Sequence, residues 1–342
     1  MDDKLNILVL AGGLSDERQV SLTSAVAIVG ALQRQGHNIN VLDTATGKSL
    51  LDSSGRYLLE KDDKSLSKIA LKQSESIVLS EAIKAEPYNK SDLVFIALHG
   101  GAGEDGTIQA LLDLVNIRYT GSNMMASAMS MNKSIAKNLI QNEKIPTPKH
   151  LLLIKDQESI DEQFKAVTES FKLPLIVKPN NSGSTVGLTM VKDVRMISKA
   201  IEMVYAISPE VLVEQYVDGR EITSAVLDDQ SYPLVEIIPS NELYDYDCKY
   251  TKGKSEYICP AKLPDEITEL IIDYGRRSYD ALKCSGLARV DFILDKDNIP
   301  WFLELNTLPG MTELSLAPMA ANEAGIDFDN LINKICQSAM KK

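Results

Sequence analysis

The sequence lacks the features that would place it at a membrane, on a nucleic acid or in an oxidising compartment. It has no apolar run close to the roughly 20 residues that a membrane span requires. Its net charge is −12, so it offers no basic surface to nucleic acid or anionic lipid. The cysteines have no CxxC spacing, so we expect free thiols; they are Cys248, Cys259, Cys284 and Cys336. These absences favour a cytoplasmic enzyme or binding protein.

Two common nucleotide-binding motifs are missing as well. The first apolar run, LNILVL at residues 5–10, leads into Gly12-Gly13, but no GxGxxG follows it, which argues against a Rossmann-type dehydrogenase. The glycine-containing stretch at 178–187 has no GK[ST] and is not a P-loop. The N-terminal run also has no basic start and no small-residue cleavage site, so it predicts a first β-strand rather than a signal peptide.

The order of apolar segments predicts an α/β protein with mixed sheets. A length of 342 residues suggests two or three domains. Strands at 5–10, 39–42 and 92–98 with a helix at 20–35 predict a small parallel sheet, whose functional loops follow the carboxyl ends of its strands. The stretch 47–90 is polar, and we expect loops or an accessory hairpin there. Further strands are expected at 175–178, 188–191, 211–216, 221–227 and 234–239, helices at 194–205 and 264–283, and then a hairpin followed by two short helices.

The C-terminal hairpin carries polar residues among apolar ones. Side chains alternate faces along a strand, so Arg289 and Asp291 share one face of the first strand, and Glu304 and Asn306 share one face of the second. The turn at 295–298 joins the two strands. Hard oxygen ligands of this kind suit Mg²⁺, which takes one or two carboxylates together with substrate phosphates. The alternative is a structural ion-pair network of Arg289, Asp291 and Glu304.

Two other segments point towards a nucleotide. The small polar loop 180–187 lies between apolar strands, and its backbone N–H groups could hold phosphate oxygens beside Lys178. An ordinary turn explains this loop equally well. In VLVEQYVDGRE, backbone groups beside Glu214 could recognise an adenine edge and Glu221 could hold ribose hydroxyls, although a glutamate at a strand end is usually just solvated. A phosphate loop and a Mg²⁺ site in one chain suggest phosphoryl transfer.

Taken together, these motifs resemble the ATP-grasp enzymes and, within them, the D-alanine–D-alanine ligases. The resemblance follows nearly the whole chain in order. Its motifs are GGLSDERQVSLTSA (12–25), HGGAGEDG (99–106), YTGSNMMASAMSMNK (119–133), KPNNSGSTVG (178–187), EQYVDGRE (214–221), YDYDCKY (244–250), ARVDF (288–292) and ELNTLPGMTELSLAPMAA (304–321).

The resemblance implies an ATP-grasp fold, in which a Rossmann-like parallel-sheet subdomain precedes two α+β subdomains that clamp ATP. We expect an N-terminal substrate-binding subdomain at 1–122, a central subdomain with the phosphate loop at 123–210, and a C-terminal subdomain with the metal site at 211–342. It also implies a homodimer, while the net charge and the lack of a long apolar run indicate that the protein binds neither nucleic acid nor membrane. The implied substrates are D-alanine and ATP, with two Mg²⁺ ions, or Mn²⁺ in their place.

The resemblance also implies a role for particular residues. ATP is expected at Lys133, Lys178, Ser184, Thr185, Glu214, Val217, Glu221 and Lys249. The metal ligands are expected to be Asp291, Glu304 and Asn306, and the catalytic residues Glu17, Ser184, Tyr250, Arg289 and Gly310. Arg289 and the Gly310 N–H would stabilise the acylphosphate and the oxyanion that follows it. The substrates are expected at Glu17, His99, Lys249, Ser315 and Leu316.

In this family Glu17 would hold the ammonium of the first D-alanine, in a hydrogen-bonded set with Ser184 and Tyr250. The alternative for Glu17 is a carboxylate favoured by the helix dipole. Lys249 and Tyr250 lie on a stretch that resembles a loop closing over the site, which would keep water from the acylphosphate. Ser315 and Leu316 would bind the carboxylate of the second substrate at a helix N-terminus.

Three departures from the family pattern weaken the choice of substrate more than the choice of reaction. They are Ser182 for a frequent Glu, Asn132 for a usual Asp, and Cys248 for Ala or Gly. The leading hypothesis is synthesis of D-alanyl-D-alanine for peptidoglycan precursors through D-alanyl phosphate. The alternatives are an ATP-grasp ligase for another pair, such as D-alanine with D-serine or D-lactate, and a non-catalytic ATP-binding relative.

Overall fold

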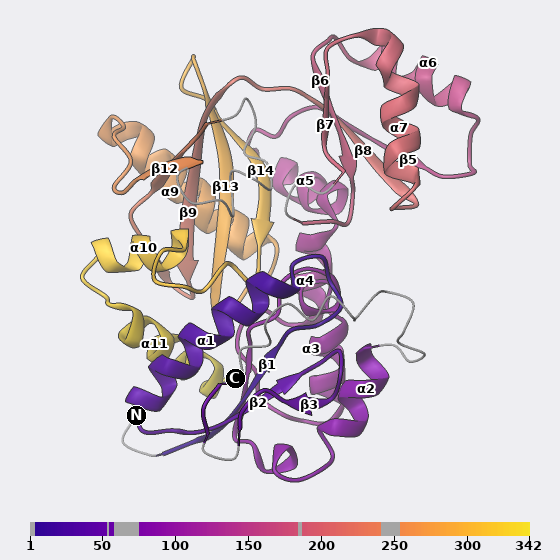
Figure 1. Cartoon of the computed structure of the whole chain (residues 1–342). Helices are drawn as coiled ribbons and strands as arrows, with labels where there is room; N and C mark the ends of the chain where they lie inside the picture. Colours follow the sequence, from indigo (N-terminus) through magenta and orange to yellow (C-terminus); the bar gives the residue numbers. More distant parts are fainter. Residues whose placement is uncertain (1–3, 53–54, 58–74, 184–186, 241–253) are drawn as a thin grey trace.

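A computed structural model describes residues 4–52, 55–57, 75–183, 187–240 and 254–342. In these residues the chain forms three β-sheets, each with its own helices, and Figure 1 shows the N-terminal sheet below the other two. The expected α/β class with mixed sheets is confirmed.

The N-terminal sheet has the order β3-β2-β1-β4. Strands β2, β1 and β4 are parallel and β3 pairs antiparallel at the edge. The apolar run of β1 is fully buried, because helices cover both faces of a parallel sheet. The elements are β1 (Asn6–Ala11), α1 (Arg18–Arg34), β2 (Asn38–Asp43), β3 (Lys48–Ser49), α2 (Glu75–Ala82), η1 (Tyr88–Lys90), β4 (Leu93–Ile96), η2 (Gly101–Gly103) and α3 (Thr107–Leu114).

Helix α2 corrects one expectation from the sequence. The stretch 47–90 was expected to contain loops or a hairpin, yet its described part includes a helix that packs beside α3. Leu79 and the following Ile83 are buried in the core with Ile108 and Leu112. The sequence of α2, ESIVLSEA, places Leu79 four residues before Ile83, and this spacing puts both side chains on the face that packs against the core.

The central sheet is antiparallel, with the order β5-β8-β6-β7. Strand β8 belongs to this sheet. The boundary expected between residues 210 and 211 would therefore separate most of β8 from β5 and β6, the two strands with which it pairs. The elements are β5 (His150–Ile154), α6 (Ile160–Ser170), β6 (Leu175–Pro179), β7 (Thr189–Val191), η3 (Val194–Met196), α7 (Ile197–Tyr205) and β8 (Glu210–Gln215).

The C-terminal sheet has the order β12-β11-β9-β13-β14, with β10 paired to β9. Helices α4 and α5 pack against β14, although they precede the central sheet in sequence. The elements are α4 (Met124–Met131), α5 (Lys133–Asn142), β9 (Gly219–Leu227), β10 (Gln230–Ser231), β11 (Val235–Pro239), β12 (Ser255–Ile258), α9 (Asp265–Ala281), β13 (Leu287–Asp295) and β14 (Pro300–Asn306).

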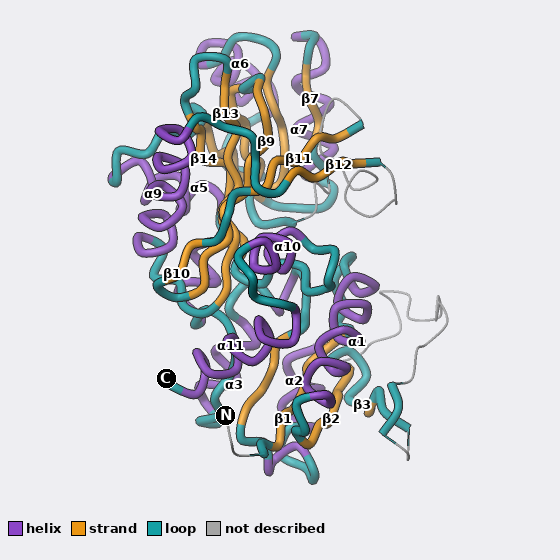
Figure 2. The backbone as a smooth tube through the Cα atoms, turned by 90° about the vertical axis from the view of Figure 1, so that its left-hand side faces the viewer, coloured by secondary structure: helices purple, strands orange, loops and turns teal. Residues whose placement is uncertain are grey.

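The end of the chain returns to the N-terminal unit. Helices α10 (Leu316–Glu323) and α11 (Phe328–Met340) lie beside α1, as Figures 1 and 2 both show. They share one apolar core with α1 and β1, and Arg34 at the end of α1 donates to Asp329 in α11 at 2.7 Å. The segment between β14 and α10 must therefore run from the C-terminal sheet to the N-terminal unit, and this places it at the junction of the two.

Candidate active site

The hairpin β13–β14 brings the four expected polar residues together. In its antiparallel register Asp291 is opposite Glu304 and Arg289 is opposite Asn306. Asp291 is buried, and its carboxylate accepts hydrogen bonds from Arg289 at 2.8 and 2.9 Å and from the Thr223 hydroxyl of β9 at 2.6 Å. The Arg289–Asp291 ion pair, which the alternative of a structural ion-pair network requires, is thus present. It lies within the polar patch that the alternation of side chains along the strands predicts.

Lys133 joins this patch to the loop after β6. As the first residue of α5 it extends its Nζ to 3.2 Å from Glu304 Oε2 and donates to the Ser182 carbonyl at 2.7 Å. Asn132 caps the helix, because its side chain accepts from the Ile135 N–H at 3.0 Å. Asn132 therefore caps the helix as an Asp at this position would. At Ser182, the backbone carbonyl rather than the side chain makes the contact with Lys133.

Glu214 is buried between two lysines. Its carboxylate lies 2.6 Å from Lys178 Nζ and 3.0 Å from Lys137 Nζ, and its exposure is 3%. Burial alone would raise the pKa of Glu214, but the two lysines outweigh it and lower the pKa to about 2. Burial lowers the pKa of Lys137, which is itself fully buried. The solvated-glutamate alternative is wrong, since this carboxylate lies inside the protein and stays ionised.

A cavity of about 150 Å³ opens above these charges, between the central and C-terminal sheets. Apolar side chains from both sheets and a cluster of charges line it. The lining includes Lys133, Ile176, Lys178, Ser182, Gly183, Leu188, Glu214, Val217, Glu221, Ile293, Leu303 and Glu304. All five described residues expected at ATP therefore lie around one cavity. Its apolar walls suit a flat base, and its lysines suit phosphates.

Glu17 lies where the N-terminal unit meets the loop after β6. It immediately precedes α1, but its side chain makes no capping hydrogen bond to the helix. A Cβ at Gly100 would lie 2.7 Å from Glu17 Oε2, and one at Gly183 would lie 2.9 Å from it. The absence of side chains at these two glycines lets the carboxylate reach the loop. The helix-dipole alternative does not account for this approach to Gly183.

The residues expected at the substrates lie around the segment that leads into α10. His99 is buried, with Nε2 3.0 Å from the Ser24 hydroxyl. Ser315 precedes α10 and accepts from the Thr312 N–H at 3.0 Å, while the Leu316 side chain is buried in the core. The Gly310 N–H donates to no atom of the described residues, so it is available to an anion.

Several expected residues fall outside the described ranges. Ser184, Thr185, Lys249 and Tyr250 are among them, as is Cys248. Their roles stay predictions. Cys259, Cys284 and Cys336 are free thiols, and burial raises the pKa of the Cys336 thiol to about 12. Such a thiol is a poor nucleophile at neutral pH.

The donor set of the hairpin fits Mg²⁺ held jointly with a nucleotide. Asp291 and Glu304 supply carboxylates and Asn306 an amide oxygen, all from paired strands beside the cavity. No cluster of three or more His, Cys, Asp or Glu suited to a metal occurs among the described residues. Two carboxylates are nevertheless sufficient for Mg²⁺ where phosphates complete its coordination.

The chain has the fold of the ATP-grasp enzymes, and its cavity lies between two of the sheets of that fold. Residues 6–122 match the family model for the D-ala D-ala ligase N-terminus, and residues 139–337 match that for the D-ala D-ala ligase C-terminus. The chain belongs to the D-alanine–D-alanine ligase family.

Individual relatives resemble the chain over its whole length. The D-alanine–D-alanine ligases of Magnetococcus marinus and Pelotomaculum thermopropionicum are 38% and 39% identical, and each alignment covers 98% of this chain and 97% of the relative. The ATP complex of the Bacillus anthracis ligase superposes with a TM-score of 0.77 at 31% identity, covering 98% of both chains. The VanG D-Ala:D-Ser ligase of Enterococcus faecalis also gives 0.77, at 28% identity, over 98% of this chain and 100% of that one.

Proposed function

We propose that this protein joins two molecules of D-alanine into D-alanyl-D-alanine, with conversion of ATP to ADP and phosphate, for peptidoglycan precursor synthesis. The observation that carries the proposal is the single cavity bordered by Lys133, Lys178, Glu214 and Glu304, in a chain that belongs to the D-alanine–D-alanine ligase family. Both features point to an ADP-forming ligase.

In the first step a carboxylate oxygen of one D-alanine attacks the γ-phosphorus of ATP, and the bond to the β-phosphate oxygen breaks. Lys133 and Lys178 would hold the phosphates against the loop after β6, and Val217 and Glu221 would border the base and ribose. The Glu17 carboxylate would pair with the substrate ammonium, which positions the reacting carboxylate. Positioning and charge neutralisation supply most of the catalysis in phosphoryl transfer.

In the second step the amine of another D-alanine attacks the acyl carbon and phosphate leaves. Arg289, held by Asp291, would lie against the phosphate, and the Gly310 N–H would donate to the oxyanion. Ser315 and the start of α10 would receive the carboxylate of the second D-alanine. Ser184, Tyr250, Thr185 and Lys249 complete the proposed set.

Asp291, Glu304 and Asn306 would hold Mg²⁺, or Mn²⁺ in its place, with two ions as the family resemblance implies. When bound, the metal would offset the charge that develops on the phosphate oxygens. Lys133 would remain close to that charge, because its Nζ already lies 3.2 Å from Glu304 Oε2.

We further infer a homodimer that works in the cytoplasm and binds neither nucleic acid nor membrane. No helix in the described ranges is long and apolar enough to cross a membrane. The net charge of −12 supports the absence of a nucleic-acid partner. Sedimentation of the purified protein would test the dimer.

A substrate panel tests the proposed reaction. Purified protein is incubated with Mg²⁺-ATP and D-alanine, L-alanine, D-serine or D-lactate, each alone and in pairs with D-alanine. ADP release and the ligated product are measured together. ADP formed with D-alanine alone, matched by D-alanyl-D-alanine, supports the proposal. If turnover required D-serine or D-lactate beside D-alanine, that compound would be the second substrate in place of D-alanine. ATP binding without turnover would favour a non-catalytic ATP-binding relative.

A further inference from the structure

The segment between β14 and α10 carries Gly310 and leads into Ser315, and its two ends are held locally. At its start the Asn306 side chain accepts from the Leu308 N–H at 3.0 Å. At its end the Ser315 hydroxyl accepts from the Thr312 N–H at 3.0 Å. Neither contact fixes the middle of the segment, where Gly310 and Met311 lie.

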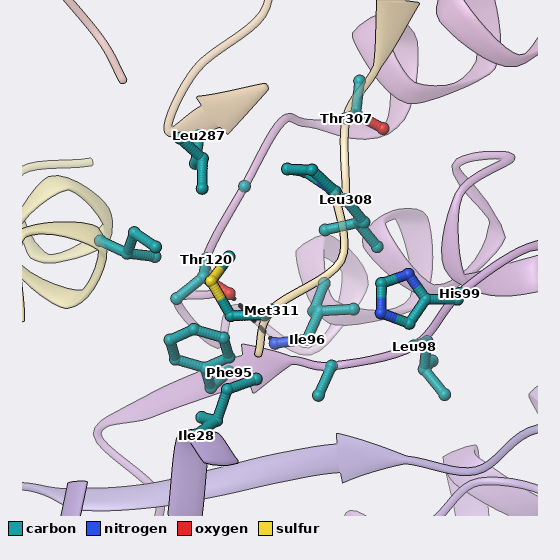
Figure 3. Close-up of a pocket in the computed structure, with 14 residues that line it drawn as sticks. Ile28, Phe95, Ile96, Leu98, His99, Thr120, Leu287, Thr307, Leu308 and Met311 are labelled. Carbon is teal, nitrogen blue, oxygen red and sulfur yellow. Dashed lines mark hydrogen bonds between the residues drawn. The ribbon is translucent and has the colours of Figure 1, made fainter. Parts of the chain in front are cut away.

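Packing beneath the middle of the segment is incomplete. A cavity of about 30 Å³ lies between this segment and strand β4, as Figure 3 shows. Leu308 and Met311 border it from the segment, and Phe95, Ile96 and His99 border it from the end of β4. Leu308 and Met311 belong to the surrounding apolar cores, but their side chains lose contacts on the side that faces the cavity.

A hydrogen bond from α1 holds the backbone of the segment at Met311. Ser24 in α1 is 1% exposed, and its hydroxyl oxygen accepts from the Met311 N–H at 3.3 Å. The same oxygen lies 3.0 Å from His99 Nε2, and His99 Nδ1 lies 3.7 Å from a Glu104 carboxylate oxygen. The Ser24 hydroxyl thus contacts His99 on one side and the Met311 backbone on the other.

We propose that Ser24 is a positioning residue for the second D-alanine. It anchors the Met311 amide, and through it the neighbouring Gly310 N–H and the turn that ends at Ser315. His99 acts through Ser24 in this arrangement. The inference rests on the proposed function, because it assigns the segment to the second substrate and to the oxyanion. It predicts that loosening the segment impairs amine attack more than formation of the acylphosphate.

The kinetic test uses Ser24→Ala. We expect its KM for the second D-alanine to rise about tenfold while KM for ATP stays within about twofold, because a misplacement near 1 Å can cost up to about 100-fold. The ratio of ADP to dipeptide should also exceed that of the wild type, since acylphosphate that waits for the amine meets water. Ser24→Cys keeps a weaker hydrogen-bond acceptor of similar size. Its KM for the second D-alanine and its ratio of ADP to dipeptide should therefore lie between those of the wild type and of Ser24→Ala.

Ser278→Ala is the matched control. Ser278 is also a fully buried helical serine, but its hydroxyl has no hydrogen-bond partner among the described residues. This variant should leave KM for both substrates and the ADP-to-dipeptide ratio unchanged. An equal rise in KM for ATP and for D-alanine in Ser24→Ala, or the same changes in Ser278→Ala, would show a general structural effect and overturn the proposal.

Hydrogen exchange tests the contact independently of activity. Peptides that cover residues 307–315 should exchange faster in Ser24→Ala than in the wild type, and not in Ser278→Ala. Unchanged exchange would refute the anchoring by Ser24, and faster exchange with no selective effect on the second D-alanine would refute its role in positioning. A wild type that makes no dipeptide would instead contradict the proposed function, while the exchange result would still decide the contact.

Discussion

Replacing Lys137 should destabilise the protein through Glu214. The two cations around Glu214 lower its pKa from 4.5 to about 2. At 1.36 kcal/mol per pKa unit this shift corresponds to about 3 kcal/mol of stability at neutral pH. Lys137→Met removes one cation and also the contact of Lys137 Nζ with the Phe302 carbonyl at 3.2 Å. We expect the free energy of unfolding to fall by about 3 kcal/mol, as for other broken buried ion pairs.

A double-mutant cycle separates this interaction from general packing. Lys137→Met and Glu214→Gln should each cost about 3 kcal/mol, and the double variant should cost well under their sum, because the second change removes the charge that the first leaves unpaired. Urea unfolding can be followed by far-UV circular dichroism and by the fluorescence of Trp301, the only tryptophan, on the same strand as Phe302.

Lys165→Met is the control for this cycle. Lys165 is exposed and its Nζ lies 3.9 Å from Glu169, so its loss should change stability by less than about 1 kcal/mol. The inferred coupling between Lys137 and Glu214 would be refuted if the two single changes lowered the free energy of unfolding additively in the double variant. It would also be refuted if Lys137→Met left the free energy of unfolding unchanged.

Three further predictions concern the site. Glu17→Gln should raise KM for the first D-alanine about 30-fold, the equivalent of about 2 kcal/mol for a lost charge pair, and unchanged KM in steady-state kinetics would contradict its role. Asp291→Asn should need at least about tenfold more Mg²⁺ for half-maximal ADP release; the same Mg²⁺ requirement would exclude it as a ligand. Because the folded pKa of Glu214 is depressed, its stabilisation is complete above pH 4.5 and is lost as pH falls towards 2. Urea midpoints measured from pH 5 downwards should therefore fall less steeply in Glu214→Gln, and parallel curves would argue against this origin.

The carboxylate hairpin could be predicted from sequence because its pattern is local. Alternation along β13 and β14 places Arg289 with Asp291 and Glu304 with Asn306, and the register of the strands then brings both pairs together. The parallel strands of the N-terminal unit could be predicted for the same reason, since β1 and β4 are continuous apolar runs.

Features that depend on contacts between distant segments could not be predicted in this way. Ser24 and Met311 are 287 positions apart, and nothing in either segment indicates that they meet. Lys137 is absent from the residues expected at the site, although it follows Lys133 by four residues, which places both on one face of α5. That spacing is the sequence feature that could have identified it. The assignment of β8 to the central sheet likewise depends on strand pairing rather than on composition.

The central claim is that the chain makes D-alanyl phosphate, and oxygen transfer tests it most directly. D-alanine labelled with ¹⁸O in its carboxylate is incubated with unlabelled Mg²⁺-ATP and the protein, and the products are examined by mass spectrometry. Attack of the carboxylate on the γ-phosphorus predicts one ¹⁸O in the inorganic phosphate for each dipeptide formed from fully labelled substrate. Label in AMP would indicate an acyl adenylate instead, and dipeptide formed with unlabelled phosphate would contradict the acylphosphate route.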